Sequence, residues 1–280
     1  MFKFEPILKT LVWGTENWVL SGVPGNESVV AEGPDKGRKI TDIYPGQFPL
    51  LIKFIDAHKD LSIQVHPDDE LARERHGCNG KTEMWYVIGA AEGAHLYSGL
   101  KEEIDPDKYV ELVREDRIVS VLADHKVAPG DVYFLPAGRI HAICGGCYLA
   151  EIQQTSDITY RIYDYNRPGL DGKPRQLHTA EAKDAIDYKV YTDYKTSYTP
   201  AEGKPVELVR CRHFSTDLLQ LNDSCTVSVD SDFLIFVCTG GSATLNGVTI
   251  KEGEAVLALS SDKSVRIVPD GPASFLTTHV

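Results

Sequence analysis

The chain has 280 residues, 42% of them hydrophobic and 25% charged, which is typical of a folded globular protein with one large or two smaller domains. Acidic residues outnumber basic ones by 41 to 29, and the resulting formal charge of −12 repels phosphate backbones, so we expect no nucleic-acid partner. The longest apolar run, residues 233–238, is too short to span a bilayer, and the first residues show no signal pattern. We therefore expect a cytoplasmic protein without a membrane partner.

Short apolar segments separated by Gly and Pro dominate the chain. In chain order, the pattern predicts strands over residues 61–65, 84–88, 132–135, 148–153, 159–163, 233–238 and 255–259. It predicts only three helices, over residues 70–76, about 106–114 and 179–185. Many short strands with few helices between them favour a mainly β fold, a sandwich or barrel with small helical insertions.

Six widely spaced cysteines favour reduced thiols. Two of them form a single Cys-x-x-Cys pattern, Cys144-Gly145-Gly146-Cys147, which has neither a second pair nor a thioredoxin-like context. We interpret it as a Gly-Gly turn between two strands, and not as a redox or zinc motif.

A change in composition over residues 188–205, rich in Tyr, Thr, Lys and Pro, predicts a domain boundary. We expect a catalytic domain over residues 1–195 and a small, non-catalytic β-domain over residues 206–280. The second segment contains only two histidines, His213 and His279, and no cluster of acids and histidines.

Candidate metal ligands come from three separate segments. Because side chains alternate along a strand, Ser62, Gln64 and His66 share the face opposite to the apolar one. Glu83 lies on a strand face that points into a core, where an ionised carboxylate is costly unless it is paired or bound to a metal. His141 follows a turn after another strand. Two imidazoles, a carboxylate and an amide form a plausible four-ligand site for Zn²⁺ or a related divalent ion.

Glu151 and Arg161 form a further candidate cluster, ten residues apart across a predicted turn. Two interpretations are open. In one, they form a surface salt bridge on an antiparallel strand pair; in the other, both project into the same cavity as the metal.

Several motifs occur together in a fixed order. They are Trp13-Gly14 with Trp18, Gln64-Val65-His66-Pro67-Asp68, Lys81-Thr82-Glu83-Met84-Trp85-Tyr86, Pro136-Ala137-Gly138 with His141, residues 151–161, and Asp164-Tyr165-Asn166-Arg167. Over residues 10–170 this series resembles the type I mannose-6-phosphate isomerases of the cupin superfamily, in their short bacterial form. The C-terminal segment resembles the small second domain of that family.

The resemblance implies a cupin jelly-roll fold, one zinc per chain bound by Gln64, His66, Glu83 and His141, and Arg161 in the active site. It also implies the interconversion of mannose 6-phosphate and fructose 6-phosphate. The chain lacks the large helical insertion of the longer eukaryotic enzymes. Asp68 stands where many cupins have a second histidine, which weakens an iron-dioxygenase interpretation.

An aldose–ketose isomerase moves one proton between two carbons through an enediol, so it needs a base, an electrophile and a phosphate anchor. Arg161 can stabilise the enediolate but is a poor base. Glu151, Lys81 and a metal-bound water remain as alternative bases.

For the phosphate of the substrate, Lys53 and Arg167 match basic positions of the family pattern, and Ser62 is a neutral donor. Two rival functions stay open: a non-catalytic metal-cupin that binds a sugar and has a regulatory role, and an isomerase for another hexose 6-phosphate. We expect a monomer or a weak homo-oligomer.

Overall fold

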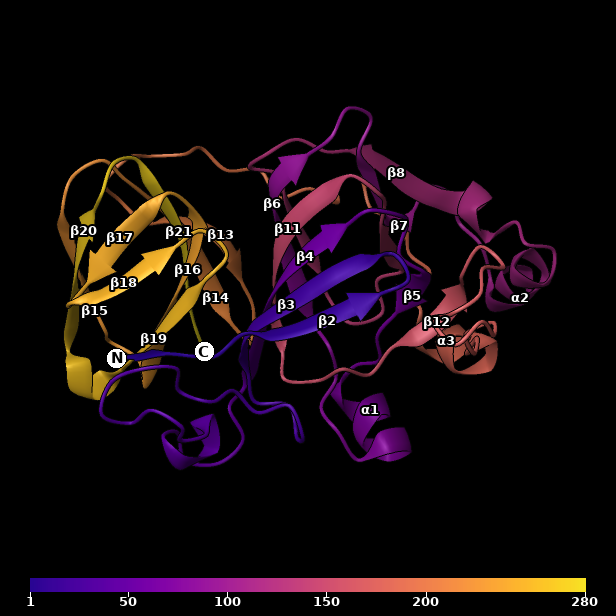
Figure 1. The fold of residues 1–280 in the computed structure, drawn as a ribbon. Coiled ribbons are helices and arrows are strands. Elements are labelled where there is room, and N and C mark those ends of the chain that lie inside the picture. Colours follow the sequence, from indigo (N-terminus) through magenta and orange to yellow (C-terminus); the bar gives the residue numbers. More distant parts are fainter. The chain divides into compact units, whose positions relative to one another are not determined.

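β-Strands are the predominant regular secondary structure in the computed structural model, which describes residues 1–280 (Figure 1). The α-helices are α1 (Asp69–His76), α2 (Pro106–Arg114) and α3 (Thr179–Ala185), and short 3₁₀ turns cover Ile40–Asp42, Ile118–Val121 and Ser260–Asp262. The Asp68 carboxylate caps α1 by accepting from the Leu71 N–H, and the Asp105 carboxylate caps α2 from the Lys108 N–H. The predicted mainly β class with small helical insertions is confirmed.

The chain forms two compact units, which we call the discontinuous unit and the central unit. The discontinuous unit combines Met1–Ile7, Asn17–Lys53 and Thr196–Val280, and the central unit combines Leu8–Glu16 and Phe54–Lys195. The sequence pattern placed all of residues 1–195 together. The grouping differs because strand pairing joins segments far apart in sequence: Phe2 in β1 (Phe2–Lys3) lies opposite Leu257 in β19 (Ala255–Leu259).

Two antiparallel sheets build the discontinuous unit. One has the order β1-β19-β16-β21-β14-β13, with β13 (Val206–Arg210), β14 (Ser215–Leu221), β16 (Phe233–Gly240) and β21 (Ala273–His279). The other has the order β15-β20-β17-β18, with β15 (Cys225–Ser228), β17 (Ser242–Leu245), β18 (Val248–Lys251) and β20 (Ser264–Pro269). Phe236 and Phe275 of the first sheet and Leu245 and Ile267 of the second belong to one buried core, so the two sheets form a sandwich.

Two further sheets contain the strands of the central unit. One has the order β12-β5-β10-β7-β8, with β5 (Ile63–Val65), β7 (His95–Leu100), β8 (Leu122–Lys126), β10 (His141–Ile143) and β12 (Tyr160–Tyr163). The other has the order β2-β3-β4-β11-β6-β9, with β2 (Ile7–Leu11), β3 (Gly14–Ser21), β4 (Leu50–Ala57), β6 (Glu83–Ala90), β9 (Val132–Leu135) and β11 (Cys147–Gln154). Residues 17–21 of β3 and 50–53 of β4 fall within the bounds of the discontinuous unit. Leu96 and Ile143 of the first sheet share a buried core with Trp85 and Leu149 of the second.

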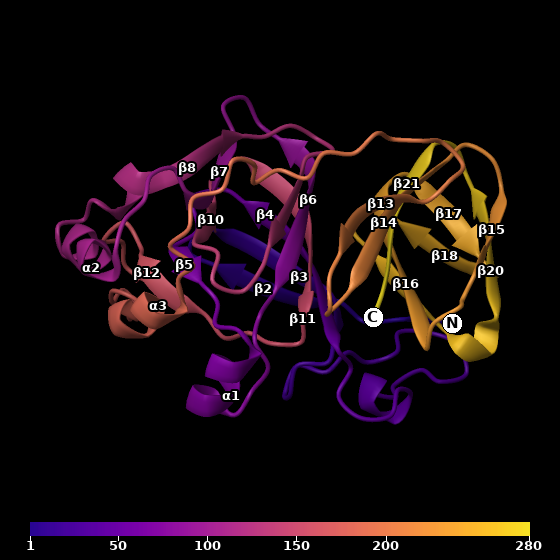
Figure 2. The same ribbon diagram turned by 180° about the vertical axis from the view of Figure 1, so that it is seen from behind.

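The two faces of β5 contact different neighbours. Ile63 and Val65 pack in a core with Tyr109 of α2 and Ala182 of α3, and both views of the ribbon place these helices beside β5 and β12 (Figure 1, Figure 2). Because side chains alternate along a strand, Gln64 points to the other face, toward the inside of the sandwich. The predicted separation of an apolar face with Ile63 and Val65 from a polar face with Gln64 is therefore confirmed.

The strands that carry Glu151 and Arg161 belong to different sheets. β11 pairs with β6, whereas β12 pairs with β5 (Figure 2). Glu151 is also buried, with 3% of its surface exposed. The interpretation of these two residues as a surface salt bridge on one antiparallel pair is therefore wrong.

The Cys-x-x-Cys segment is the predicted turn, since β10 ends at Ile143 and β11 begins at Cys147. All six cysteines are free. Burial raises the pKa of Cys147 to about 11 and raises that of Cys144 further, so both stay as thiols. Among the helices, none combines the length and the apolar character that crossing a membrane requires.

Candidate metal centre and active site

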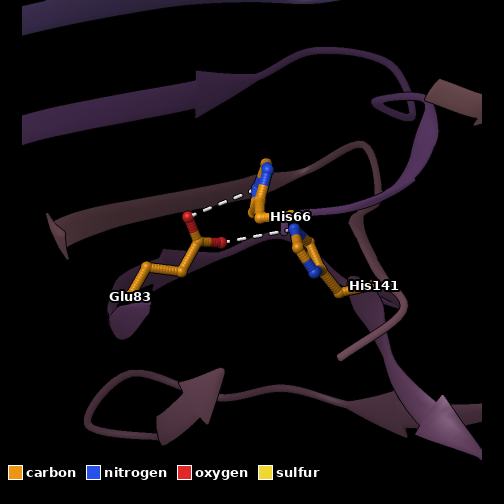
Figure 3. Close-up of side chains that lie close together, drawn as sticks. All are labelled: His66, Glu83 and His141. Carbon is orange, nitrogen blue, oxygen red and sulfur yellow. Dashed lines mark ion pairs between the residues drawn. The ribbon is translucent and has the colours of Figure 1, made fainter. Parts of the chain in front are cut away.

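His66, Glu83 and His141 meet inside the sandwich of the central unit (Figure 3). Their nearest ligand atoms all lie within 4.8 Å of one another, and the three side chains are almost completely buried. The Nε2 of His66 is 3.6 Å from Glu83 Oε2, and the Nε2 of His141 is 3.3 Å from Glu83 Oε1. The sequence predicted this grouping from three separate segments, and the fold brings them together.

Backbone carbonyls fix the orientation of both imidazole rings. The Nδ1 of His66 is 2.9 Å from the Ile158 carbonyl, and the Nδ1 of His141 is 2.8 Å from the Arg139 carbonyl. A carbonyl only accepts, so each ring donates from Nδ1 and keeps the lone pair of Nε2 for the cluster. Burial lowers the pKa of His141 to about 3, which keeps this ring neutral. Neutral imidazoles with aligned Nε2 atoms are the form that binds a metal ion.

The residues present fit a divalent cation. His141 Nε2 is buried and makes no hydrogen bond although it lies close to Glu83. Glu83 offers a buried carboxylate and the two histidines offer imidazole nitrogens, a mixed set of oxygen and nitrogen donors. Such a set suits Zn²⁺ or a related divalent ion.

Gln64 lies in the same row of the sheet as His141 and Arg161. In the register of β5 it is directly opposite His141 on one side and Arg161 on the other. Residues directly opposite each other project from the same face, about 4.5–5.5 Å apart at Cβ. The row therefore places the predicted fourth ligand and the predicted catalytic arginine on the face that carries the cluster.

Lys81 and Glu151 lie beside the cluster. The Lys81 Nζ is 2.6 Å from Glu83 Oε2, 3.0 Å from His66 Nε2 and 3.8 Å from Glu151 Oε1. The Trp85 indole N–H donates to Glu151 Oε2 at 2.8 Å, across the register pair of β6 and β11. Both candidate bases are thus held at the cluster, which the sequence alone did not establish.

The loop that follows β12 supplies the hydrogen-bond partners of Arg161. Its Nη1 donates to the Gln176 carbonyl at 3.0 Å, its backbone N–H donates to the His178 Nδ1, and its Nε makes no hydrogen bond. Burial and the positive charges of Arg175 and Arg167 lower the pKa of Arg161. The surroundings of this guanidinium are therefore electropositive.

A single carboxylate organises that loop. Arg175 donates twice to Asp164, at 2.6 Å each, and Arg167 donates to the same carboxylate at 3.0 Å. Asp164 and Arg167 lie only three residues apart, so both fall within one motif of the sequence. The pairing of Arg175 with Asp164 could not be predicted in this way, because the two residues are eleven positions apart across a loop.

The three residues predicted to contact the phosphate of the substrate differ in burial and in their partners. Ser62 is buried just before β5 begins, and Arg167 is engaged with Asp164. Lys53 belongs to the discontinuous unit, where its ammonium lies 5.2 Å from the centre of the Trp18 ring.

Comparisons with known proteins find relatives along the whole chain. The profile of the catalytic domain of type I phosphomannose isomerase matches residues 3–89. The chain is 31% identical over 292 residues to the mannose-6-phosphate isomerase ManA of Bacillus subtilis, covering 91% of each protein. It is 30% identical to the mannose-6-phosphate isomerase of Streptococcus mutans, covering 94% of this chain and 88% of the relative. The crystal structure of the mannose 6-phosphate isomerase from Bacillus subtilis matches with a TM-score of 0.91 and 30% identity, covering 100% of this chain and 99% of that one.

Proposed function

This chain belongs to the type I phosphomannose isomerase family, and we propose that it interconverts mannose 6-phosphate and fructose 6-phosphate with one zinc ion per chain. The observation that carries the proposal is the buried cluster of His66, Glu83 and His141 with Lys81 and Glu151 beside it. The metal-ligand set is completed by Gln64, which shares a row of the sheet with His141.

Zinc, when bound, supplies a redox-inert Lewis acid for the oxygens of the sugar, which suits a reaction without net electron transfer. Its ligands would be Gln64, His66, Glu83 and His141. The two Nδ1–H bonds to backbone carbonyls support the assignment, since they direct the Nε2 lone pairs of both rings into the cluster.

The chain's own residues then move the proton between C2 and C1 of the sugar. Glu151 is our first candidate for the base, because the Trp85 N–H and the Lys81 ammonium fix its carboxylate next to the cluster. Lys81 and a water of the site are the alternatives. A positioned base contributes about 10²- to 10⁴-fold to the rate.

Arg161 stabilises the negative oxygen of the enediolate. Its guanidinium is permanently charged, and its Nε is buried without a hydrogen bond, a donor that the protein itself does not satisfy. Preorganised charge of this kind stabilises a transition state because it needs no rearrangement when the negative charge develops.

The phosphate of the substrate requires local positive charge on a protein of net charge −12. Arg161, Arg167 and Arg175 surround one carboxylate, Asp164, and together leave an excess of positive charge near the row of Gln64. We assign Arg167 and Ser62 to the phosphate, and the role expected for Lys53 from the family pattern stays a prediction. The cytoplasmic location and the monomeric or weakly oligomeric state stay predictions.

The test is a coupled assay of the purified protein on mannose 6-phosphate and other hexose 6-phosphates, with and without chelator and added Zn²⁺. We expect turnover of mannose 6-phosphate, its loss with chelator and its return with Zn²⁺. Preference for another hexose 6-phosphate would favour the rival isomerase. Metal binding without any turnover would favour the sugar-binding protein.

Metal analysis of a His66→Ala/His141→Ala double variant tests the ligand set. About one zinc per chain is expected in the unmodified protein and none in the double variant. Equal metal content in both proteins would contradict the site.

A further inference from the structure

The segment that follows α3, residues 186–195, is fastened along the central unit, and we call it the strap. The Asp187 N–H donates to the Gly138 carbonyl at 2.8 Å, and the Tyr194 hydroxyl donates to the Leu100 carbonyl at 2.7 Å. Tyr194 is buried against β7, where a Cβ on Gly99 would lie 2.1 Å from its ring. Much of the strap falls within the Tyr-rich stretch that composition marks as a boundary, yet its contacts are those of an integral element.

Two tyrosines of the strap pack against a buried arginine. The Arg139 guanidinium lies 4.7 Å from the centre of the Tyr191 ring and 4.6 Å from that of Tyr194, and the two rings contact each other edge-on at 5.9 Å. Only 8% of Arg139 is exposed. An arginine beside two aromatic rings is held by cation–π attraction, and the attraction grows when water is excluded. The strap therefore holds the side chain of the residue that ends the turn Pro136-Ala137-Gly138-Arg139.

The same turn is bonded to both histidines of the cluster. The Gly138 N–H donates to the His66 carbonyl at 2.9 Å, and the Arg139 carbonyl accepts from the His141 Nδ1–H at 2.8 Å. Gly138 has a φ of +90°, which glycine adopts readily and an L-residue rarely does, so the shape of the turn depends on this glycine. A displacement of this turn would shift the backbone of His66 and change the direction of the Nε2 lone pair of His141.

We propose that Tyr191 and Tyr194 are positioning residues of the metal centre, because they pack against Arg139 and so hold the turn that bonds the backbone of His66 and orients the ring of His141. The inference rests on the metal centre proposed above. Outer partners that orient ligating histidines are worth about 10- to 100-fold in metal affinity. The contribution of the tyrosines comes through one further residue, so we expect the lower end of that range.

Tyr191 is the better position for a test because 40% of its surface is exposed, so its replacement leaves the core intact. Tyr191→Leu removes the aromatic face at similar size, whereas Tyr191→Phe keeps the face and removes only the hydroxyl that donates to Asp187. Val190→Ala, at the exposed neighbouring position, is the matched control.

The measurement is the dissociation constant of Zn²⁺ for the metal-stripped full-length protein, obtained by competition with a chromophoric chelator. Tyr191→Leu should weaken binding by about 10-fold. Tyr191→Phe and Val190→Ala should bind like the unmodified protein. The visible absorption of the Co²⁺-loaded protein should change in Tyr191→Leu alone, since it reports the geometry of the ligands. Equal affinity and an equal spectrum in Tyr191→Leu, or a Phe variant as weak as the Leu variant, would overturn the proposal.

A double-mutant cycle with Arg139→Leu tests the route of the effect. If Tyr191 acts through Arg139, the double variant Tyr191→Leu/Arg139→Leu should bind Zn²⁺ no more weakly than Arg139→Leu alone. Fully additive losses would overturn the proposed route. Urea unfolding of the metal-free variants checks that Tyr191→Leu retains the stability of the unmodified fold.

The outcomes separate this inference from the proposed function. If the unmodified protein binds Zn²⁺ no better than His66→Ala/His141→Ala, the metal centre itself is wrong and the inference falls with it. If those two proteins differ as expected and Tyr191→Leu behaves like the unmodified protein, only the inference is wrong. Failure to turn over mannose 6-phosphate with normal Zn²⁺ binding would contradict the reaction and leave the role of the strap intact.

Discussion

Arg161 is the residue whose replacement separates transition-state stabilisation from binding. If its guanidinium acts as negative charge develops on the enediolate, Arg161→Ala should lower kcat by about 10²-fold or more, on the order of 3 kcal/mol. KM should change much less, and zinc content should stay constant. Arg161→Lys should restore little, because an ammonium lacks the planar fork of donors.

Steady-state kinetics with mannose 6-phosphate distinguish the alternatives for Arg161. A rise in KM with unchanged kcat would make it a phosphate anchor. Full activity of Arg161→Ala would remove it from the site, in spite of its place in the row with Gln64 and His141.

The thiols of Cys144 and Cys147 should be chemically inert in the folded protein. Burial holds the pKa of Cys147 near 11 and raises that of Cys144, and only the thiolate reacts with alkylating agents. Iodoacetamide at mildly alkaline pH followed by peptide mass spectrometry should leave both unmodified, whereas all six cysteines should react in urea. Rapid labelling of either one in the native protein would revive the redox or zinc interpretation of this turn.

At the scale of an element, the loop after β12 depends on the carboxylate of Asp164. Burial opposes its ionisation, but the hydrogen bonds and charges of Arg175 and Arg167 outweigh burial and lower the pKa of Asp164. A folded-state pKa below the unfolded value of about 3.9 stabilises the fold above that pH, and the contribution is lost as the pH falls through the folded-state pKa.

Asp164→Asn should therefore reduce the free energy of unfolding at neutral pH by about 1.5–3 kcal/mol, the range for hydrogen bonds to charged groups. The difference from the unmodified protein should shrink when the pH is lowered past about 4. Urea titrations across this range measure it. Asp171→Asn is the control, because this exposed carboxylate of the same loop accepts from the Lys173 backbone N–H, and its replacement should have little effect at any pH. A pH-independent loss in Asp164→Asn would argue against the charge pairing.

At the scale of the whole molecule, the catalytic groups are expected in the central unit. Gln64, His66, Glu83 and His141 all belong to it, whereas His213 and His279 belong to the sandwich of the discontinuous unit. His213→Ala/His279→Ala should leave kcat and KM nearly unchanged in the coupled assay. A large loss of turnover with normal circular dichroism and normal thermal unfolding would place catalytic groups in the discontinuous unit and contradict the domain assignment.

Features that depend on short stretches of chain could be predicted from the amino-acid pattern. Alternation over residues 62–66 was enough to place Gln64 and His66 on the face opposite Ile63, because the period of a strand is a local property. The helix caps at Asp68 and Asp105 are local for the same reason. The ordered motifs also indicated the family, which the comparisons confirm.

Strand pairing and the surroundings of each site residue could be read only from the folded structure. Examples are the entry of β11 and β12 into different sheets, the hydrogen bond from Trp85 to Glu151, and the packing of Arg139 against Tyr191 and Tyr194. Each of these contacts joins residues that are 52 or more positions apart in the chain. Such contacts carry no local pattern, because packing of a complete core selects them. The candidate ligands and bases could therefore be predicted from short motifs. The residues that hold them in place could be identified only in the folded chain.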